Sequence, residues 1–139
     1  MKGVGIDPHP EINFDKKSVT VQKGTFPGLN LQQTNFDAII MLAVLEHIPK
    51  EKLNLISEEC RALLKINGLL LMTVPSKRVD FILRILKKIK LIEAETLDQH
   101  YGFDVNRVEE LFDSWHFKLL VKRKFQLGLN NLFVFVKIA

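Results

Sequence analysis

The sequence lacks the features that would place it in several large classes of protein. It has a single cysteine, Cys60, so no internal disulfide is possible and a reducing, cytoplasmic location is the simplest interpretation. No apolar run approaches the roughly 20 residues of a membrane span, and the first residues contain no apolar signal-peptide core. A net charge of +4 is too mildly basic to indicate nucleic acid. We therefore expect neither a membrane nor a nucleic-acid partner.

Metal chemistry is also not expected. His9, His100 and His116 are scattered, no pair of histidines has the i, i+4 spacing of a helical metal site, and only one cysteine is present. What the chain does have is 139 residues with a hydrophobic fraction of 47%, which is enough for one buried core and too little for two ordinary domains. We expect a single domain over residues 1–139.

Hydrophobic patterning predicts an alternation of strands and helices. Strands are expected at residues 2–6, 18–22, 36–42, 69–74, 117–124 and 131–138, and helices at residues 50–65, 77–92 and 104–112. The runs at 36–42 and 69–74 are continuously apolar, which is typical of strands buried on both faces. Asn67-Gly68 and the group Gly128, Asn130 and Asn131 are expected to form turns. This order predicts an α/β fold with a mainly parallel sheet and a C-terminal antiparallel hairpin.

Several polar residues follow the expected strands. Ligands of open α/β sheets bind at the carboxyl ends of the strands, and Asp7, residues 42–47 and Pro75-Ser76 all fall at such ends. An aspartate there can accept hydrogen bonds from both hydroxyls of a ribose. His47 has the titration range of a general base. These positions are the candidate ligand site.

Four segments, in order and at the right spacing, resemble class I S-adenosylmethionine-dependent methyltransferases. They are GVGIDPHPE at 3–11, FDAIIMLAVLEHIP at 36–49, CRALLKINGLLLMTVPS at 60–76 and HYGFDVNRVEELFDSWHF at 100–117. The resemblance implies a three-layer Rossmann-like sheet. It also implies that Asp7 holds the cofactor ribose, that Thr25 lies near the adenine, and that Leu42 and Ala43 line the cofactor site. Glu46 and His47 would then face the methyl acceptor as the candidate catalytic pair.

Each of these residues also has a structural interpretation. Asp7 could form a turn by bonding its own backbone, and Glu46 and His47 could simply start the following helix. Cys60 is expected in the core. The basic helix expected at 77–92 is interpreted as covering the sheet with its cations in solvent, rather than lying on a membrane.

The resemblance starts at the family's second strand. The Gly-x-Gly-x-Gly turn that normally approaches the cofactor is not among the 139 residues, so we expect an N-terminally truncated domain that binds S-adenosylmethionine weakly or not at all. In the family the first strand lies between the second and the fourth. Without it, residues 36–42 would lack a neighbour. We expect either pairing with residues 2–6 or a homodimer through the N-terminal strand or residues 42–47.

Two functions are therefore open. The first is methyl transfer from S-adenosylmethionine to a small-molecule or glycan-type acceptor, as the resemblance implies. The second is a catalytically inactive methyltransferase-fold remnant that acts as an interaction or dimerisation module. A peripheral membrane module built on the basic helix is a weaker third possibility.

Overall fold

The computed structural model describes residues 2–9, 18–29, 31–32, 34–76, 79 and 103–139. Contacts divide the chain into two compact units, Met1–Gln32 and Gln33–Ala139, and each is described by itself. The expectation of a single domain over the whole chain stays a prediction. The basic helix expected at 77–92 lies outside the described residues, apart from residue 79.

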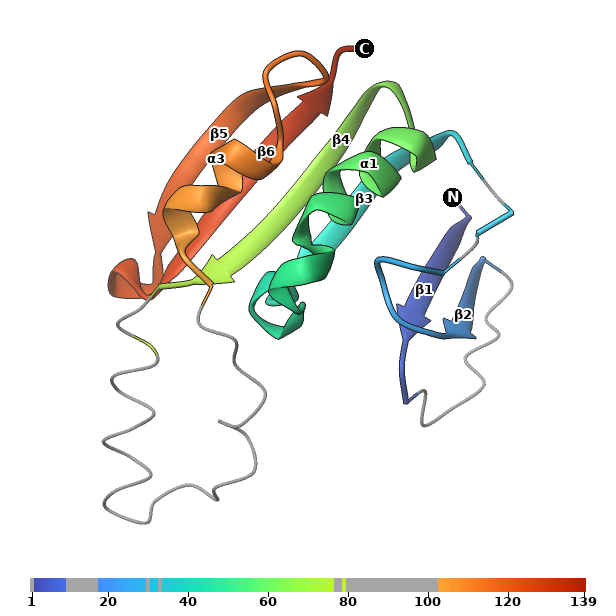
Figure 1. Cartoon of the computed structure of the whole chain (residues 1–139), viewed down its shortest axis with the longest axis horizontal. Coiled ribbons are helices and arrows are strands. Elements are labelled where there is room, and N and C mark those ends of the chain that lie inside the picture. The colour runs from blue at the N-terminus through green and yellow to red at the C-terminus, as the bar shows by residue number, and fades with distance from the viewer. Residues whose placement is uncertain (1, 10–17, 30, 33, 77–78, 80–102) are drawn as a thin grey trace. The chain divides into compact units, whose positions relative to one another are not determined.

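The first unit contains two parallel strands. Strand β1 (Gly3–Asp7) pairs with β2 (Val19–Lys23), with Gly3 opposite Val19 and Asp7 opposite Lys23 (Figure 1). Both strands were predicted to within one residue. A further hydrogen bond from the backbone N–H of Gly24 to the carbonyl of Asp7, at 3.0 Å, closes the carboxyl end of this ladder.

The second unit contains a four-stranded sheet in the order β3-β4-β6-β5. Its strands are β3 (Phe36–Leu42), β4 (Leu64–Pro75), β5 (Phe117–Phe125) and β6 (Asn130–Lys137). Strand β3 is parallel to β4, whereas β6 is antiparallel to both β4 and β5. The α/β class and the C-terminal antiparallel hairpin are therefore confirmed.

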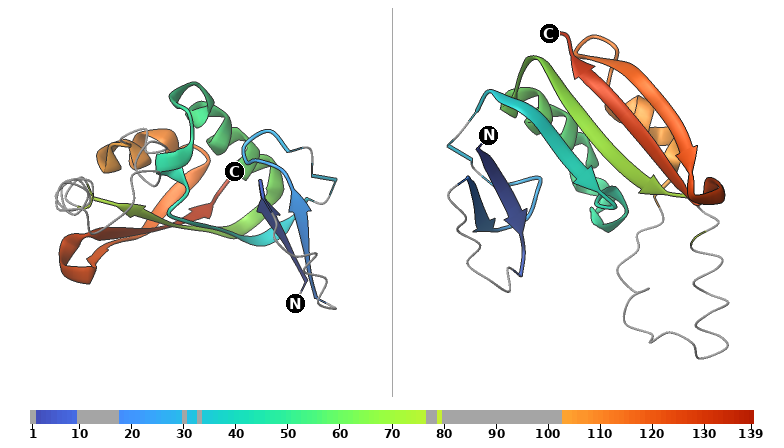
Figure 2. Two further views of the ribbon diagram at one scale, coloured as in Figure 1. Left: turned by 90° about the horizontal axis from the view of Figure 1, so that it is seen from below. Right: turned by 180° about the vertical axis from the view of Figure 1, so that it is seen from behind.

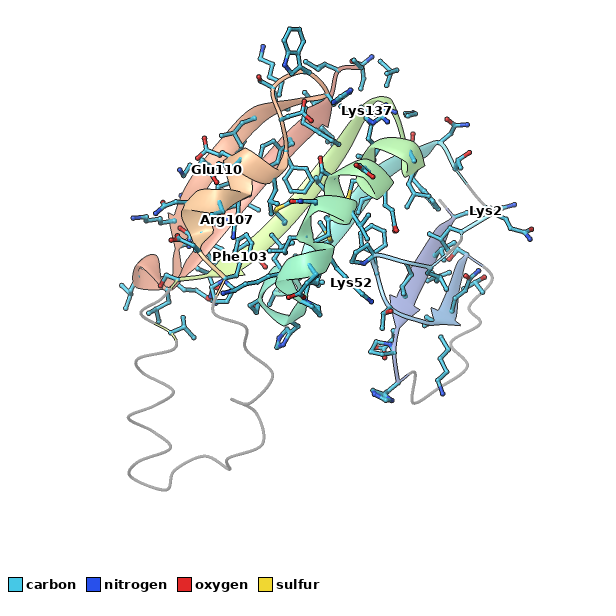
Figure 3. All side chains as sticks on the ribbon, in the orientation of Figure 1. Lys2, Lys52, Phe103, Arg107, Glu110 and Lys137 are labelled. Atoms are coloured by element: carbon cyan, nitrogen blue, oxygen red, sulfur yellow. The ribbon has the colours of Figure 1, made fainter. Side chains whose placement is uncertain are left out.

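Helical segments connect the strands of the second unit. Their bounds are η1 (Leu45–His47), η2 (Lys50–Lys52), α1 (Leu53–Leu63), η4 (Val105–Arg107), α3 (Val108–Leu111) and η5 (Gln126–Gly128). Asp104 caps the helical turn η4, since its Oδ1 accepts the N–H of Asn106 at 3.1 Å. At the C-terminal end of α1, Lys137 Nζ donates hydrogen bonds to the carbonyls of Arg61 and Leu64 at 2.7 and 2.8 Å; Lys137 is labelled in Figure 3.

Helices α1 and α3 lie on the same face of the four-stranded sheet (Figure 2), here called the covered face. The core lies between them and the sheet. Its buried side chains include Ile56 and Cys60 of α1, Val108 of α3, and Phe112, which follows α3. From the sheet come Leu70, Met72 and Val74 of β4, and Phe133 and Phe135 of β6. The Phe112 ring meets Phe117 edge-on with 5.4 Å between centroids. Edge-to-face contact adds to the stabilisation from area burial alone.

The opposite face of this sheet, here called the bare face, corrects one prediction. Strands 36–42 and 69–74 were expected to be buried on both sides, but Ile40 is 64% and Leu42 is 62% exposed, and Leu69 is also exposed. Successive side chains of a strand point to opposite faces. The sequence neighbours of these residues, such as Met41 and Leu70, are therefore buried under the helices. The described helices cover one face only.

One predicted turn is also wrong, and a second, in the hairpin, is shifted along the chain. Strand β4 begins at Leu64, directly after α1, and Asn67 and Gly68 lie inside it. Asn67 has φ 64°, and a Cβ on Gly68 would lie 2.8 Å from the carbonyl oxygen of Lys65. Asn67 and Gly68 thus lie where the β3–β4 ladder is irregular, because its register shifts between Phe36 and Ala38.

In the hairpin, the turn is formed by Gln126–Gly128, and Asn130 and Asn131 belong to β6. Asn131 is buried, and its Nδ2 donates to the carbonyl of Val74 at 3.1 Å. A sequence pattern cannot distinguish this buried, hydrogen-bonded asparagine from a turn-forming one, because Asn131 lies three residues after Gly128 and asparagine close to glycine is typical of turns.

Candidate functional site

In the first unit, two candidate residues lie at the carboxyl end of the parallel pair. Asp7 is the last residue of β1 and is exposed, and Thr25 follows β2 closely and is also exposed. Asp7 Oδ1 accepts the N–H of His9 at 2.7 Å. This is the turn-forming bond of the structural interpretation, and it uses only one of the acceptor sites of the carboxylate.

In the second unit, the chain turns sharply at the end of β3. Ala43 has φ 53°, and its N–H lies 3.1 Å from both the carbonyl oxygen and the Oγ1 of Thr73. A non-glycine residue in this region is strained, and such strain often accompanies functional turns. The turn leaves Leu42 exposed and directs the chain into η1.

Glu46 and His47 share the short helical turn η1 but differ in environment. The Glu46 side chain is buried at 4% exposure, whereas His47 is exposed. Neither residue is without an interacting partner. They lie in a separate helical turn and do not start the following helix, since α1 begins at Leu53. The two residues therefore suit different roles. The buried carboxylate of Glu46 can position neighbouring groups, whereas the exposed imidazole of His47 can reach a ligand.

Sequence reasoning noted Ser76 only as part of a strand end. The structure shows that its Oγ is buried, with no hydrogen-bond partner among the described residues. Its backbone N–H donates to the carbonyl of Leu129 at 2.7 Å, which fixes its position at the end of β4. Thr73 was missed, and the signal that could have identified it is a hydroxyl residue near the end of an apolar run.

The remaining candidates are structural. Cys60 is fully buried, and burial raises the pKa of its thiol, so it is confirmed as a core residue. Within the described ranges, no group of three metal-ligating side chains is found. No helix in the same part of the chain is long and apolar enough to cross a membrane.

The candidate residues therefore form two groups. Asp7 and Thr25 lie at the carboxyl end of the β1–β2 ladder, and residues 42–47 lie with Thr73 and Ser76 at the carboxyl end of the β3–β4 ladder. The carboxyl ends of parallel strands are where open α/β sheets bind ligands.

Comparison with known families agrees with this arrangement. The family described as "Methyltransferase domain" matches residues 2–72, just over half of the chain. This protein belongs to the class I S-adenosylmethionine-dependent methyltransferase family. The matched residues contain β1, β2, β3 and most of β4, and with them Asp7, Thr25 and residues 42–47, whereas Pro75-Ser76 lie beyond the match. A search of the curated proteins found no match.

Solved structures share the methyltransferase fold at low sequence identity. The PH0226 protein of Pyrococcus horikoshii OT3 is 16% identical with a TM-score of 0.70, over 98% of this chain and 73% of that one. A TehB-like SAM-dependent methyltransferase of Corynebacterium glutamicum is 14% identical with a TM-score of 0.69, over 98% and 68%. NodS, an N-methyltransferase of Bradyrhizobium japonicum solved with S-adenosyl-L-homocysteine, is 12% identical with a TM-score of 0.54, over 86% and 55%. The Rossmann-like fold is therefore confirmed.

Proposed function

We propose that this methyltransferase domain transfers the methyl group of S-adenosylmethionine to a small-molecule or glycan-type acceptor. The observation that carries the proposal is the family match over residues 2–72, which contain Asp7, Thr25 and residues 42–47. The bound S-adenosyl-L-homocysteine of NodS, a protein of the same fold, is the product that such a transfer leaves behind.

The proposed cofactor contacts follow from the chemistry of each residue. The exposed carboxylate of Asp7 can accept hydrogen bonds from the ribose hydroxyls, because the bond from His9 uses only part of its capacity. Thr25 would lie near the adenine. Leu42 and Ala43 would line the cofactor site, where the exposed Leu42 side chain offers an apolar contact.

The transfer itself needs little covalent chemistry from the protein. A nucleophilic atom of the acceptor attacks the methyl carbon in line, the carbon–sulfur bond breaks, and its electron pair returns to sulfur. Positioning dominates such a step, and a base is needed only when the acceptor carries a proton. The exposed His47 would take that proton, and the buried Glu46 would hold the η1 turn in place.

Titration calorimetry with S-adenosylmethionine and S-adenosyl-L-homocysteine tests the proposal. The 139 residues contain no Gly-x-Gly-x-Gly turn, and each lost polar contact to a charged group costs about 1.5–3 kcal/mol, so we expect millimolar rather than micromolar binding. Asp7→Ala should remove this binding, whereas Asp37→Ala, at another exposed aspartate, should not. Micromolar affinity would contradict the expected weakness. No binding at millimolar concentration would contradict the enzymatic function.

A second function is favoured by the bare face. Exposed Ile40 and Leu42 lie beside one another on the edge strand of the sheet, which suits a catalytically inactive module whose role is assembly. We propose that this assembly is a homodimer. The two functions differ in a direct assay, because the module would associate without producing S-adenosyl-L-homocysteine from the cofactor and any acceptor.

A further inference from the structure

The turn that ends β3 requires an unusual backbone conformation. Ala43 has φ 53°, in the left-handed region where the Cβ of an ordinary residue is crowded by neighbouring backbone atoms. Glycine would remove this crowding, but the chain has alanine at the position. A strained backbone persists only where the surrounding structure holds it, so another group must stabilise the turn.

That group is Thr73 of β4, the strand that pairs with β3 in the sheet (Figure 1). The backbone N–H of Ala43 donates to the carbonyl oxygen of Thr73 and also to its Oγ1, each at 3.1 Å. Any residue in place of Thr73 would supply the carbonyl, which continues the β3–β4 ladder. The hydroxyl acceptor is what the threonine side chain adds.

The register of the sheet explains why the hydroxyl reaches this N–H. Thr73 lies opposite Leu42, and it stands between Met72 and Val74, whose side chains are buried on the covered face. Alternation along β4 therefore places the Thr73 side chain on the bare face, beside Leu42 and the backbone that follows it. A valine of the same shape would fill this place without offering an acceptor.

Buried residues hold the chain on both sides of the turn. Met41 precedes it and Leu45 follows it, and these residues are 4% and 1% exposed. Leu42 and Ala43 lie between them and are exposed. The hydrogen bond to Thr73 thus acts on a short stretch that core packing does not hold, and it fixes the direction in which the chain leaves β3 toward η1.

We propose that Thr73 is a positioning residue of the cofactor site, and that its hydroxyl holds Leu42 and Ala43 in the conformation that binds S-adenosylmethionine. This inference rests on the proposed function, in which these two residues line the site. Affinity falls in proportion to the fraction of molecules whose site already has the binding conformation. One neutral hydrogen bond changes such a fraction by up to about tenfold. Thr73 acts in this way without touching the cofactor.

The amide signal of Ala43 in nuclear magnetic resonance reports the hydrogen bond without any ligand. Thr73→Val keeps the side-chain shape and removes the acceptor, so hydrogen exchange at the Ala43 N–H should become about threefold to tenfold faster. Thr73→Ser keeps the hydroxyl and should restore slow exchange. Thr20→Val, at an exposed threonine of β2, is the matched control and should leave the Ala43 signal unchanged. Circular dichroism establishes that each variant is folded.

Titration of the amide signals with S-adenosylmethionine measures the consequence for binding. Thr73→Val should raise the dissociation constant by about threefold to tenfold, whereas Thr73→Ser and Thr20→Val should stay within about twofold of the wild type. A second background distinguishes positioning from direct contact. Glycine adopts the left-handed region without strain, so in an Ala43→Gly background Thr73→Val should raise the dissociation constant by less than about twofold.

The outcomes separate this inference from the proposed function. No change in the wild-type signals at millimolar S-adenosylmethionine would contradict the proposed function, and the role of Thr73 in it. Wild-type binding that Thr73→Val leaves unchanged would overturn the inference alone. So would equal weakening in the Ala43→Gly background, which would mean that Thr73 contacts the cofactor directly, or equal weakening by Thr73→Ser, which would mean that the hydroxyl is not the group that matters.

Discussion

The two faces of the four-stranded sheet are built from the same strands yet differ in almost every physical respect. On the covered face, Met72, Phe133 and Phe135 are buried under α1 and α3. On the bare face, Ile40 and Leu42 are more than half exposed. Residues one position apart in the sequence thus have opposite environments, although both are apolar.

This difference shows that the apolar composition of a strand makes burial favourable on either face. The neighbouring elements determine which face is actually buried. The covered face contributes the stability of the second unit, because burial of aromatic and aliphatic area is the main favourable contribution to folding. The bare face carries side chains of the same kind without that gain. Contiguous exposed apolar surface of this type usually marks an interaction site.

Thiol labelling should give the largest contrast between the faces. Cys60 is buried beneath the covered face, and burial raises the pKa of its thiol, so it should react only through unfolding. Leu42→Cys adds a second thiol on the bare face. With about one molecule in 10³ or fewer unfolded, the native thiol should react at least about 10³-fold more slowly than the introduced one. Stopped-flow labelling should show two phases, which merge in denaturant; a fast phase from the wild-type protein would show that α1 does not protect Cys60.

Truncation of neighbouring residues in β6 should separate the faces by free energy. Phe133→Ala leaves a cavity under the helices and should cost about 3–5 kcal/mol in the free energy of unfolding. Val134→Ala, one residue along on the half-buried bare face, should cost about 1 kcal/mol. Urea unfolding followed by circular dichroism measures both. Equal costs would mean that the bare face is covered in solution.

A polar contact inside the covered face gives a smaller effect. Asn131→Ala removes the hydrogen bond from Nδ2 to the carbonyl of Val74 and leaves a buried acceptor without its partner, which should cost about 1–3 kcal/mol. Asn54→Ala, at an exposed position of α1, serves as the control and should change stability by no more than about 0.5 kcal/mol. If the two substitutions had the same effect, Asn131 would not be hydrogen-bonded in the core.

The smallest effect is expected at the turn before β5, away from either face. A hydrogen bond from the His116 ring, at 3.0 Å, with further bonds from the N–H groups of Trp115 and His116, lowers the pKa of Asp113. A lowered folded-state pKa stabilises the fold above the unfolded-state pKa, and this contribution is lost as the pH falls through the folded-state value. Both side chains are partly exposed, so the contribution is small.

Asp113→Asn should therefore lower stability slightly near neutrality, where the contribution is present, and this difference from the wild type should disappear as the pH falls below about 4. Urea midpoints recorded between about pH 6 and about pH 2.5 measure this. Identical pH profiles for the variant and the wild type would show that Asp113 and His116 do not interact in solution.

Much of the fold was predictable because strand patterns are local. The bounds of β3 were predicted to the residue and those of β1 to within one, since β-branched and apolar runs followed by a turn define a strand regardless of its neighbours. The start of β4 was not predictable. Asn67 and Gly68 have the composition of a helix stop, and only the close approach of the Lys65 carbonyl explains why glycine is needed there.

For the candidate site, the sequence located the strand ends but not the environments. Asp7, Leu42 and Ala43 lie at the carboxyl ends where they were expected. The burial of Glu46, the exposure of His47 and the buried hydroxyl of Ser76 depend on how η1, α1 and the turn after β5 pack around them, and no local pattern encodes that packing.

The sequence by itself determined the family, the α/β class and the order of the elements, because these follow from periodicity and from motifs within short stretches of chain. The tertiary structure decided which side of each strand is buried. Alternation along a strand divides its side chains between two faces in advance, but only the placement of α1 and α3 excludes water from one of them.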